Sequence, residues 1–228
     1  MRFGQETFPV VVPEHQCAAF EAGWEWLAQP GGAWTADEKL AMVAAMRNAE
    51  ARPLWDRRPA TIGHLSSVAT ASATLSPLVV DTVERVAVEA GAITREWATG
   101  VIDALGDAAF AELVAVCATV IPIDCACRLL GRSIEPLPDP VVGEPTGERA
   151  DATVDIGAYL PVAVGFPGAN VAKSLSVAPT ANLMRLGVVR ALYSGTRFGE
   201  LRWEDGALNR PQVELIAART SALNECFY

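Results

Sequence analysis

The chain has 228 residues, of which 51% are hydrophobic, and its formal net charge is −9. This length fits one large domain or two small domains with a hydrophobic core. The negative charge argues against binding to nucleic acids and to anionic membrane surfaces. We see no apolar run of about 18 residues and no apolar segment after Met1, so we expect no transmembrane helix and no signal peptide. The five cysteines are irregularly spaced, which fits a reducing, cytoplasmic location.

Helix signals run through the first 131 residues. The clearest is Thr35-Ala36-Asp37-Glu38, a capping box in which Thr and Glu each satisfy a backbone N–H group of the other. Ser76-Pro77 is a second clear start, because serine caps a helix and proline suits its first position. Apolar residues at helical spacing follow each start. The predicted helices cover residues 14–28, 35–52, 76–90, 94–105 and 107–130, the last of them capped by Asp107.

Several thiols lie in these helices, and we interpret them as structural. Cys17 follows His15 at a helix start, but no second pair of ligands stands nearby, so no metal site is predicted. Cys125 and Cys127 are two residues apart, so on a helix their side chains point about 200° away from each other. Together with Cys117 they are interpreted as buried core residues.

A proline-rich segment divides the chain. We predict a helical unit over residues 1–131, a linker over 132–155 and the beginning of a second unit over 156–228. In the second unit, residues 158–169 read as a loop. A helix is then predicted over 179–193, with a buried face formed by Leu183, Leu186, Val189 and Leu192.

The last stretch carries the most specific pattern. Asn209 is a natural N-cap with Gln212 three residues later, and apolar residues at helical spacing include Leu215, Ala218 and Ala222. The segment 213–217 echoes residues 111–115, which suggests two related helical units. All periodic segments are helical, so the predicted fold class is all-α.

The segment from Glu214 to Tyr228 reads Glu-Leu-Ile-Ala-Ala-Arg-Thr-Ser-Ala-Leu-Asn-Glu-Cys-Phe-Tyr. It resembles the core of the alkylhydroperoxidase D / carboxymuconolactone decarboxylase superfamily. In the peroxidase branch a glutamate precedes a Cys-x-x-Cys pair, and a histidine follows. Glu214 and Cys226 match the glutamate and the first cysteine, and the resemblance implies that they are catalytic. They are twelve residues apart, so they do not share one face of a straight helix.

The resemblance implies an all-α bundle of two related units, a homo-oligomer, and reduction of a hydroperoxide with a dithiol reductant. A thiolate attacks the peroxide and becomes a sulfenic acid, which a second thiol converts to a disulfide. No cofactor and no metal are expected. In the first unit Arg52-Pro53-Leu54-Trp55 occupies the place where relatives often carry a second Cys-x-x-Cys, so that unit is expected to be degenerate. The alternatives are a decarboxylase-type enzyme of the same superfamily and a non-catalytic helical protein.

The second cysteine of the pair would follow Tyr228 directly, where the sequence stops, so the second unit is expected to be incomplete. We therefore expect little peroxidase turnover from these 228 residues. One hypothesis is that a UGA codon encodes selenocysteine at the next position and that the product continues. A frameshift, a pseudogene and a deliberate truncation are the alternatives.

Overall fold

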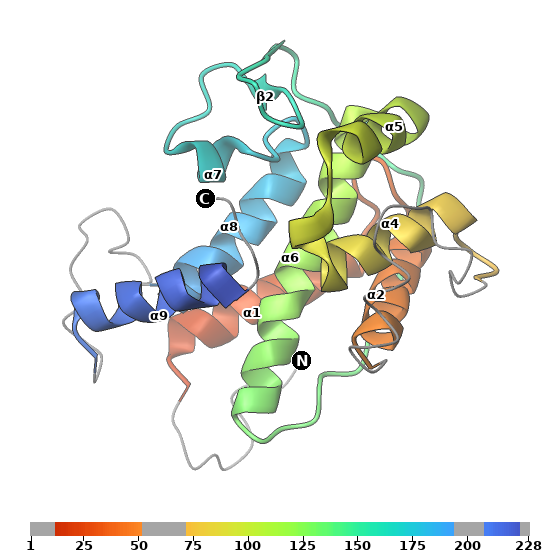
Figure 1. The fold of residues 1–228 in the computed structure, drawn as a ribbon. Coiled ribbons are helices and arrows are strands. Elements are labelled where there is room, and N and C mark those ends of the chain that lie inside the picture. Colours follow the sequence, from red (N-terminus) through yellow and green to blue (C-terminus); the bar gives the residue numbers. More distant parts are fainter. Residues whose placement is uncertain (1–11, 52–71, 194–207, 224–228) are drawn as a thin grey trace.

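The computed structural model describes residues 12–51, 72–193 and 208–223, which are mostly helical with negligible strand (Figure 1). This confirms the predicted predominance of helix. The helices are α1 (Glu14–Leu27), α2 (Ala36–Ala51), α4 (Pro77–Val88), α5 (Arg95–Leu105), α6 (Asp107–Leu129), α7 (Asn170–Lys173), α8 (Pro179–Tyr193) and α9 (Arg210–Leu223). A short 3-10 turn, η1, covers Ala90–Ala92.

Two very short strands interrupt the helical pattern. β1 (Thr153–Val154) pairs antiparallel with β2 (Val162–Ala163), with Thr153 opposite Ala163. The prediction that residues 158–169 form only loop was wrong at this point. Each strand has two residues, which is too short for an alternating pattern to be visible in the sequence.

The predicted helix starts are confirmed by their hydrogen bonds. Thr35 N–H donates to Glu38 Oε2 at 2.9 Å, and Glu38 N–H donates to Thr35 Oγ1 at 3.2 Å. Asn209 and Gln212 form the same reciprocal pair at the start of α9, at 2.8 and 3.1 Å. The predicted cap at Asp107 was wrong, because the N-cap of α6 is Gly106, whose φ of 90° suits glycine.

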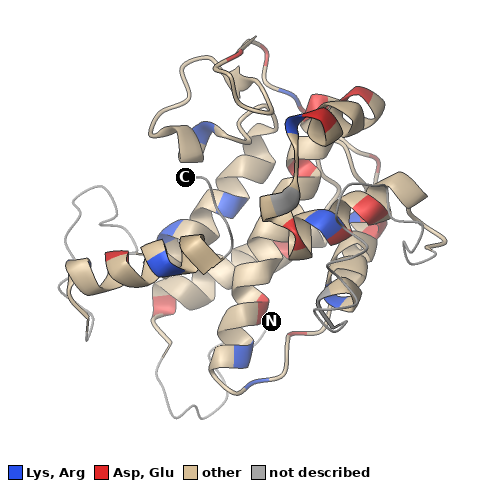
Figure 2. Ribbon diagram, in the orientation of Figure 1, with Lys and Arg blue, Asp and Glu red and all other residues tan. Residues whose placement is uncertain are grey.

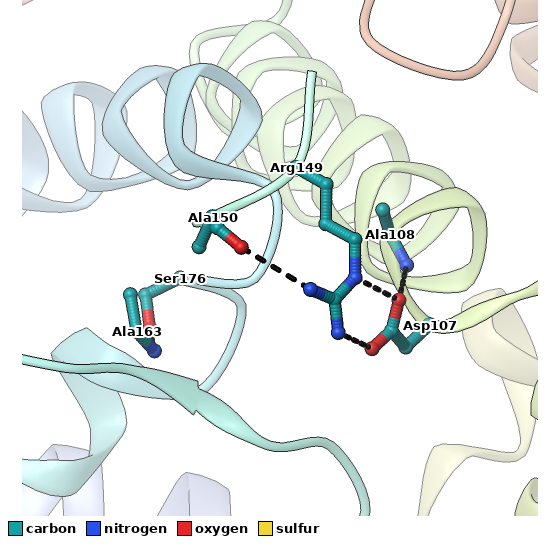
Figure 3. Close-up of polar contacts among 6 residues, drawn as sticks. All are labelled: Asp107, Ala108, Arg149, Ala150, Ala163 and Ser176. Atoms are coloured by element: carbon teal, nitrogen blue, oxygen red, sulfur yellow. Dashed lines mark hydrogen bonds and ion pairs between the residues drawn. The ribbon is translucent and has the colours of Figure 1, made fainter. Parts of the chain in front are cut away.

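Asp107 instead belongs to the first turn of α6 and binds a distant arginine (Figure 3). Arg149 donates to both carboxylate oxygens of Asp107, at 3.0 and 2.7 Å, and also to the Ala150 carbonyl at 3.2 Å. The Asp107 carboxylate also accepts the N–H of Ala108 at 2.7 Å. These bonds fix the segment after α6 against the start of that helix.

The core is built around α6, which packs against α1, α2, α4, α5 and α8. Its buried residues occur all around its circumference, as expected for a central helix. Figure 2 shows how few charged residues it carries. By length and composition α6 could cross a membrane, yet most of its apolar stretch is buried inside the protein, as in the core helix of a helical bundle.

The segment predicted as a linker is packed onto the helical core along part of its length. Trp24 Nε1 donates to the Pro136 carbonyl at 2.9 Å, and Val141 N–H donates to the Ala28 carbonyl at 2.8 Å. Further on, α8 packs against both α1 and α6. The division into two units stays a prediction. The contacts of α8 with α1 and α6 join the two predicted units to each other.

The buried face of α8 differs from the predicted one. Leu186 is buried, but Leu183 and Leu192 are exposed. The residues that are buried are mainly small or polar: Ala181, Asn182, Arg185, Leu186, Val188 and Ala191. Small side chains allow α8 to approach α1 and α6 closely. The prediction failed because it considered only the spacing of large apolar residues and not the size of the side chains.

A buried ion pair connects α2 to α6. Arg47 Nε and Nη2 donate to the two carboxylate oxygens of Asp124, both at 2.8 Å, and the Asp124 side chain is fully buried. Removing one partner of such a pair leaves an uncompensated charge, which costs about 3–5 kcal/mol.

We therefore expect Asp124→Asn to lower the free energy of unfolding by about 3 kcal/mol. The matched control is Asp107→Asn, because Asp107 also holds an arginine by two bonds but Arg149 is largely exposed. That change should cost less than about 1 kcal/mol. Urea unfolding measures both, and equal losses would contradict the importance of the Arg47–Asp124 pair.

Candidate functional site

Glu214, one of the two residues predicted to be catalytic, lies in the second turn of α9. Its Oε1 is 3.5 Å from Arg210 Nε, one turn earlier, and its side chain is 45% exposed. Burial raises the pKa of the Tyr193 hydroxyl, and so do the negative charge of Glu214 and its hydrogen bond with that hydroxyl. The end of α8 and the start of α9 therefore meet around the Glu214 carboxylate.

Cys226, the other predicted catalytic residue, lies outside the described residues. The same holds for the segment 52–55, where the first unit was expected to be degenerate.

The outer face of α9 is apolar and exposed. Leu215, Ile216 and Leu223 are 70%, 54% and 64% exposed, and Ala218 and Ala222 are exposed as well. Leu215, Ala218 and Ala222 are thus not buried against another element of the described chain, and their burial against another subunit stays a prediction. The half-buried residues of α9 are Arg210, Val213, Glu214, Ala217 and Ser221.

Glu112, whose surroundings in the sequence echo those of Glu214, lies in a very different environment. It is buried on α6, where its Oε2 accepts the Ala33 N–H at 2.7 Å. Gly31 lies so close that a Cβ added there would overlap Oε1. That oxygen has no hydrogen-bond partner among the described residues. Burial raises the pKa of Glu112, while the Ala33 N–H and the charge of Lys39 act in the opposite direction.

Lys39, in the first turns of α2, is the second buried charge in this region. It is fully buried, its Nζ donates to the Trp26 carbonyl at 2.6 Å, and the ammonium lies 4.2 Å from the centre of the Trp26 ring. Burial lowers the pKa of Lys39 to about 8, and the charge of Glu112 opposes that shift. Nothing in the sequence pattern indicated Lys39, which sits among ordinary helix-forming residues.

Two chain segments enclose the Glu112 carboxylate. The Gly31 and Gly32 carbonyls accept the N–H groups of Thr146 and Gly147 at 2.9 and 2.8 Å. Glu148 then accepts the N–H and the hydroxyl of Thr180, at the start of α8, at 3.1 and 2.8 Å. We call Lys39, Glu112 and Glu148 the charge cluster, in which Lys39 and Glu112 are buried and Glu148 is half-buried. The charge cluster joins α2, α6, the loop after α1 and the segment before β1.

The cluster can hold and exchange protons, but its donor set does not suit a metal ion. Among the described residues no group of three or more His, Cys, Asp or Glu side chains is placed to bind one. Its closest packing is around Gly31, so its first role is structural.

The described cysteines differ in exposure, and Cys17 is half-buried. Cys117 and Cys127 are buried, as predicted, but Cys125 is exposed, which corrects the prediction for that residue. The two-residue spacing of Cys125 and Cys127 puts them on different faces of α6. Burial raises the pKa of the Cys17 and Cys127 thiols, which favours the unreactive protonated form.

Comparison with protein-family models, with curated proteins and with solved structures finds no match for this chain. The functional argument therefore depends on its own residues.

Gly31→Ala should destabilise the protein by about 2 kcal/mol, because the added methyl group would displace the Glu112 carboxylate or the loop. The matched control is Gly187→Ala in α8, where an added Cβ meets no atom within 4 Å. That variant should gain about 0.5–1 kcal/mol from its higher helix propensity. Urea unfolding compares the two, and equal effects would show that the contact with Glu112 is not tight.

Stability should rise with pH above about 8, because Lys39 titrates near that pH in the folded protein and near 10.5 when unfolded. In this interval the unfolded state binds more protons, so folding becomes more favourable as pH increases. The gain is at most about 3 kcal/mol, at about 1.4 kcal/mol per pKa unit. In the wild type the urea midpoint should increase between about pH 8 and pH 10.5, and in Lys39→Met this increase should be absent. In Glu112→Gln the rise should begin at lower pH, and an unchanged profile in both variants would refute the assignment.

Proposed function

We propose that this protein is a thiol oxidoreductase of the alkylhydroperoxidase D type, which reduces hydroperoxides with electrons from a dithiol. Cys226 is the reacting thiol. Glu214 is the carboxylate that moves its proton through a water relay, because the two residues do not share one face of a straight helix. The observation that carries the proposal is the segment from Glu214 to Tyr228, which resembles the catalytic core of that family. The proposal includes the fold of that family, with one unit around α6 and the other around α9.

The surroundings of Glu214 support a role in proton transfer. Arg210 Nε lies 3.5 Å from the carboxylate, and Tyr193 shares a hydrogen bond with it. The side chain is partly exposed, so protons can exchange with water. A carboxylate held in this way can accept the thiol proton and later donate it to a leaving oxygen.

The reaction proceeds in two steps. The Cys226 thiolate attacks one peroxide oxygen, so that an S–O bond forms and the O–O bond breaks. The other oxygen leaves as an alkoxide, takes up the proton and departs as the alcohol. A dithiol then reduces the resulting sulfenic acid, which releases water, regenerates the thiol and leaves the reductant as a disulfide. The dithiol supplies the two electrons that the peroxide consumes.

The test uses the whole chain with a hydroperoxide and a sulfenic-acid trapping reagent, followed by mass spectrometry. Cys226 should be trapped at least tenfold faster than Cys125, an exposed thiol that serves as the internal control. Glu214→Gln should slow trapping at Cys226 by about 100-fold, the usual size of a general acid–base contribution. Equal trapping at the two cysteines, or full reactivity in Glu214→Gln, would refute the assigned roles.

We also propose that α9 mediates formation of a homo-oligomer. The support is its exposed apolar face, because soluble monomers rarely leave such a surface uncovered. A non-catalytic assembly role, the alternative to enzyme activity, would use the same face.

Light scattering should give a mass that is a multiple of the 24.2 kDa chain. The double variant Leu215→Glu, Leu223→Glu should shift the protein to the monomer, because two charges cannot be buried in an apolar interface. Val142→Glu is the control, since Val142 is exposed on a segment outside α9. A wild-type monomer, or a control that dissociates equally, would exclude α9 as the interface.

A further inference from the structure

Arg185 is a buried cation held mostly by neutral groups. The residue is 8% exposed, and it lies on the face of α8 that meets α7. Its Nε and Nη2 donate to Asn182 Oδ1 at 3.3 and 2.8 Å, and Nη2 also donates to the Val171 carbonyl at 3.0 Å. Asn182 in turn donates to the Ala172 carbonyl at 2.9 Å. The guanidinium is therefore oriented by α7 and by its own helix.

Several other arginines are paired with carboxylates, whereas the exposed Arg95 donates to the carbonyls of Gly157 and Ala158. Arg47 pairs with Asp124, Arg85 with Asp81, Arg132 with Glu135 and Arg149 with Asp107. Within the described ranges, Arg185 has no such partner. Burial alone lowers its pKa, with no contribution from a nearby charge. A buried charge without a counter-charge is costly, and this makes Arg185 an exception that needs an explanation.

The charge distribution around Arg185 is equally unusual. Residues 156–193 contain no Asp or Glu but include Lys173, Arg185 and Arg190, although the whole chain carries a net charge of −9. Figure 2 shows the same along α7 and α8, where basic residues occur without acidic ones. A positive region in an acidic protein attracts anions, and a guanidinium binds oxygen anions through paired N–H groups.

We propose that Arg185 anchors a binding site for a small oxyanion, of the phosphate or carboxylate type, at the junction of α7 and α8. Neutral acceptors orient Nε and Nη2, while Nη1 has no acceptor among the described residues and is the group that the ligand binds. The bound anion supplies the negative charge that none of the described residues places there. Glu214 makes none of the contacts of Arg185.

A purely structural role for Arg185, as a brace between α7 and α8, makes a different prediction. In that case stability depends on Arg185 but not on which anion is present. The oxyanion site instead requires saturable binding, and it requires that binding depends on Arg185 more than on a neighbouring arginine of the same helix.

The experiment measures thermal unfolding of the full chain with inorganic phosphate, with acetate and with sodium chloride at one constant ionic strength. Phosphate or acetate should raise the Tm with saturation, and the more effective one identifies the ligand type. Arg190→Gln, an exposed arginine on α8, should keep this response, whereas Arg185→Gln should lose it. If Arg185→Gln does not fold, Arg185→Lys is used in its place. We expect this variant to bind the more effective anion at least tenfold more weakly than the wild type does.

Phosphorus NMR of inorganic phosphate, titrated with folded wild-type protein and with Arg190→Gln, gives a second measurement of binding. Line broadening in both samples supports the site. The proposal is overturned if neither phosphate nor acetate exceeds the effect of chloride, or if Arg190→Gln abolishes the response as completely as the Arg185 variant.

Discussion

A buried carboxylate must be matched by donors or by opposite charge, and Glu112 meets this requirement mainly with the backbone of a loop. The Ala33 N–H binds its Oε2, and Gly31 comes so close that no larger residue fits. Because α6 is the central helix, this contact fixes the chain between α1 and α2 against the first turns of α6. The segment around Thr146 then binds the outer side of the same loop. The loop is therefore held from two sides, by the Glu112 side chain and by backbone bonds to the segment at Thr146.

The burial of Lys39 follows from the same arrangement. Its ammonium is desolvated, which lowers its pKa, and the carbonyl and ring of Trp26 compensate only in part. The charge of Glu112 acts in its favour, so the two groups stabilise each other's charged forms. The charge of Asp124, nearer the C-terminal end of α6, is compensated differently, by two hydrogen bonds from Arg47. Two buried acids of one helix thus connect it to α2 through different chemistry.

The proposed reactive centre is separate from this core. Burial keeps Cys17 and Cys127 in the protonated form, which suits packing rather than nucleophilic attack. Glu214 is partly exposed beside Tyr193 and Arg210, and the outer face of α9 is apolar. A partly exposed carboxylate next to an apolar surface can serve proton transfer while the neighbouring surface serves assembly. The basic region around Arg185 is a third, distinct environment.

The sequence by itself determined where several of the helices begin. The boxes at Thr35 and Asn209 are satisfied within four residues, so their hydrogen bonds do not depend on the rest of the fold. The tertiary structure alone decided which faces are buried. Leu183 and Leu215 are exposed, whereas Lys39 and Arg185 are buried, because partners distant in sequence determine the cost of burying each side chain. Glu112 shows the difference most clearly. The residues that flank it in the sequence resemble those that flank Glu214, but tertiary contacts such as the one with the loop at Gly31 make its environment a buried one.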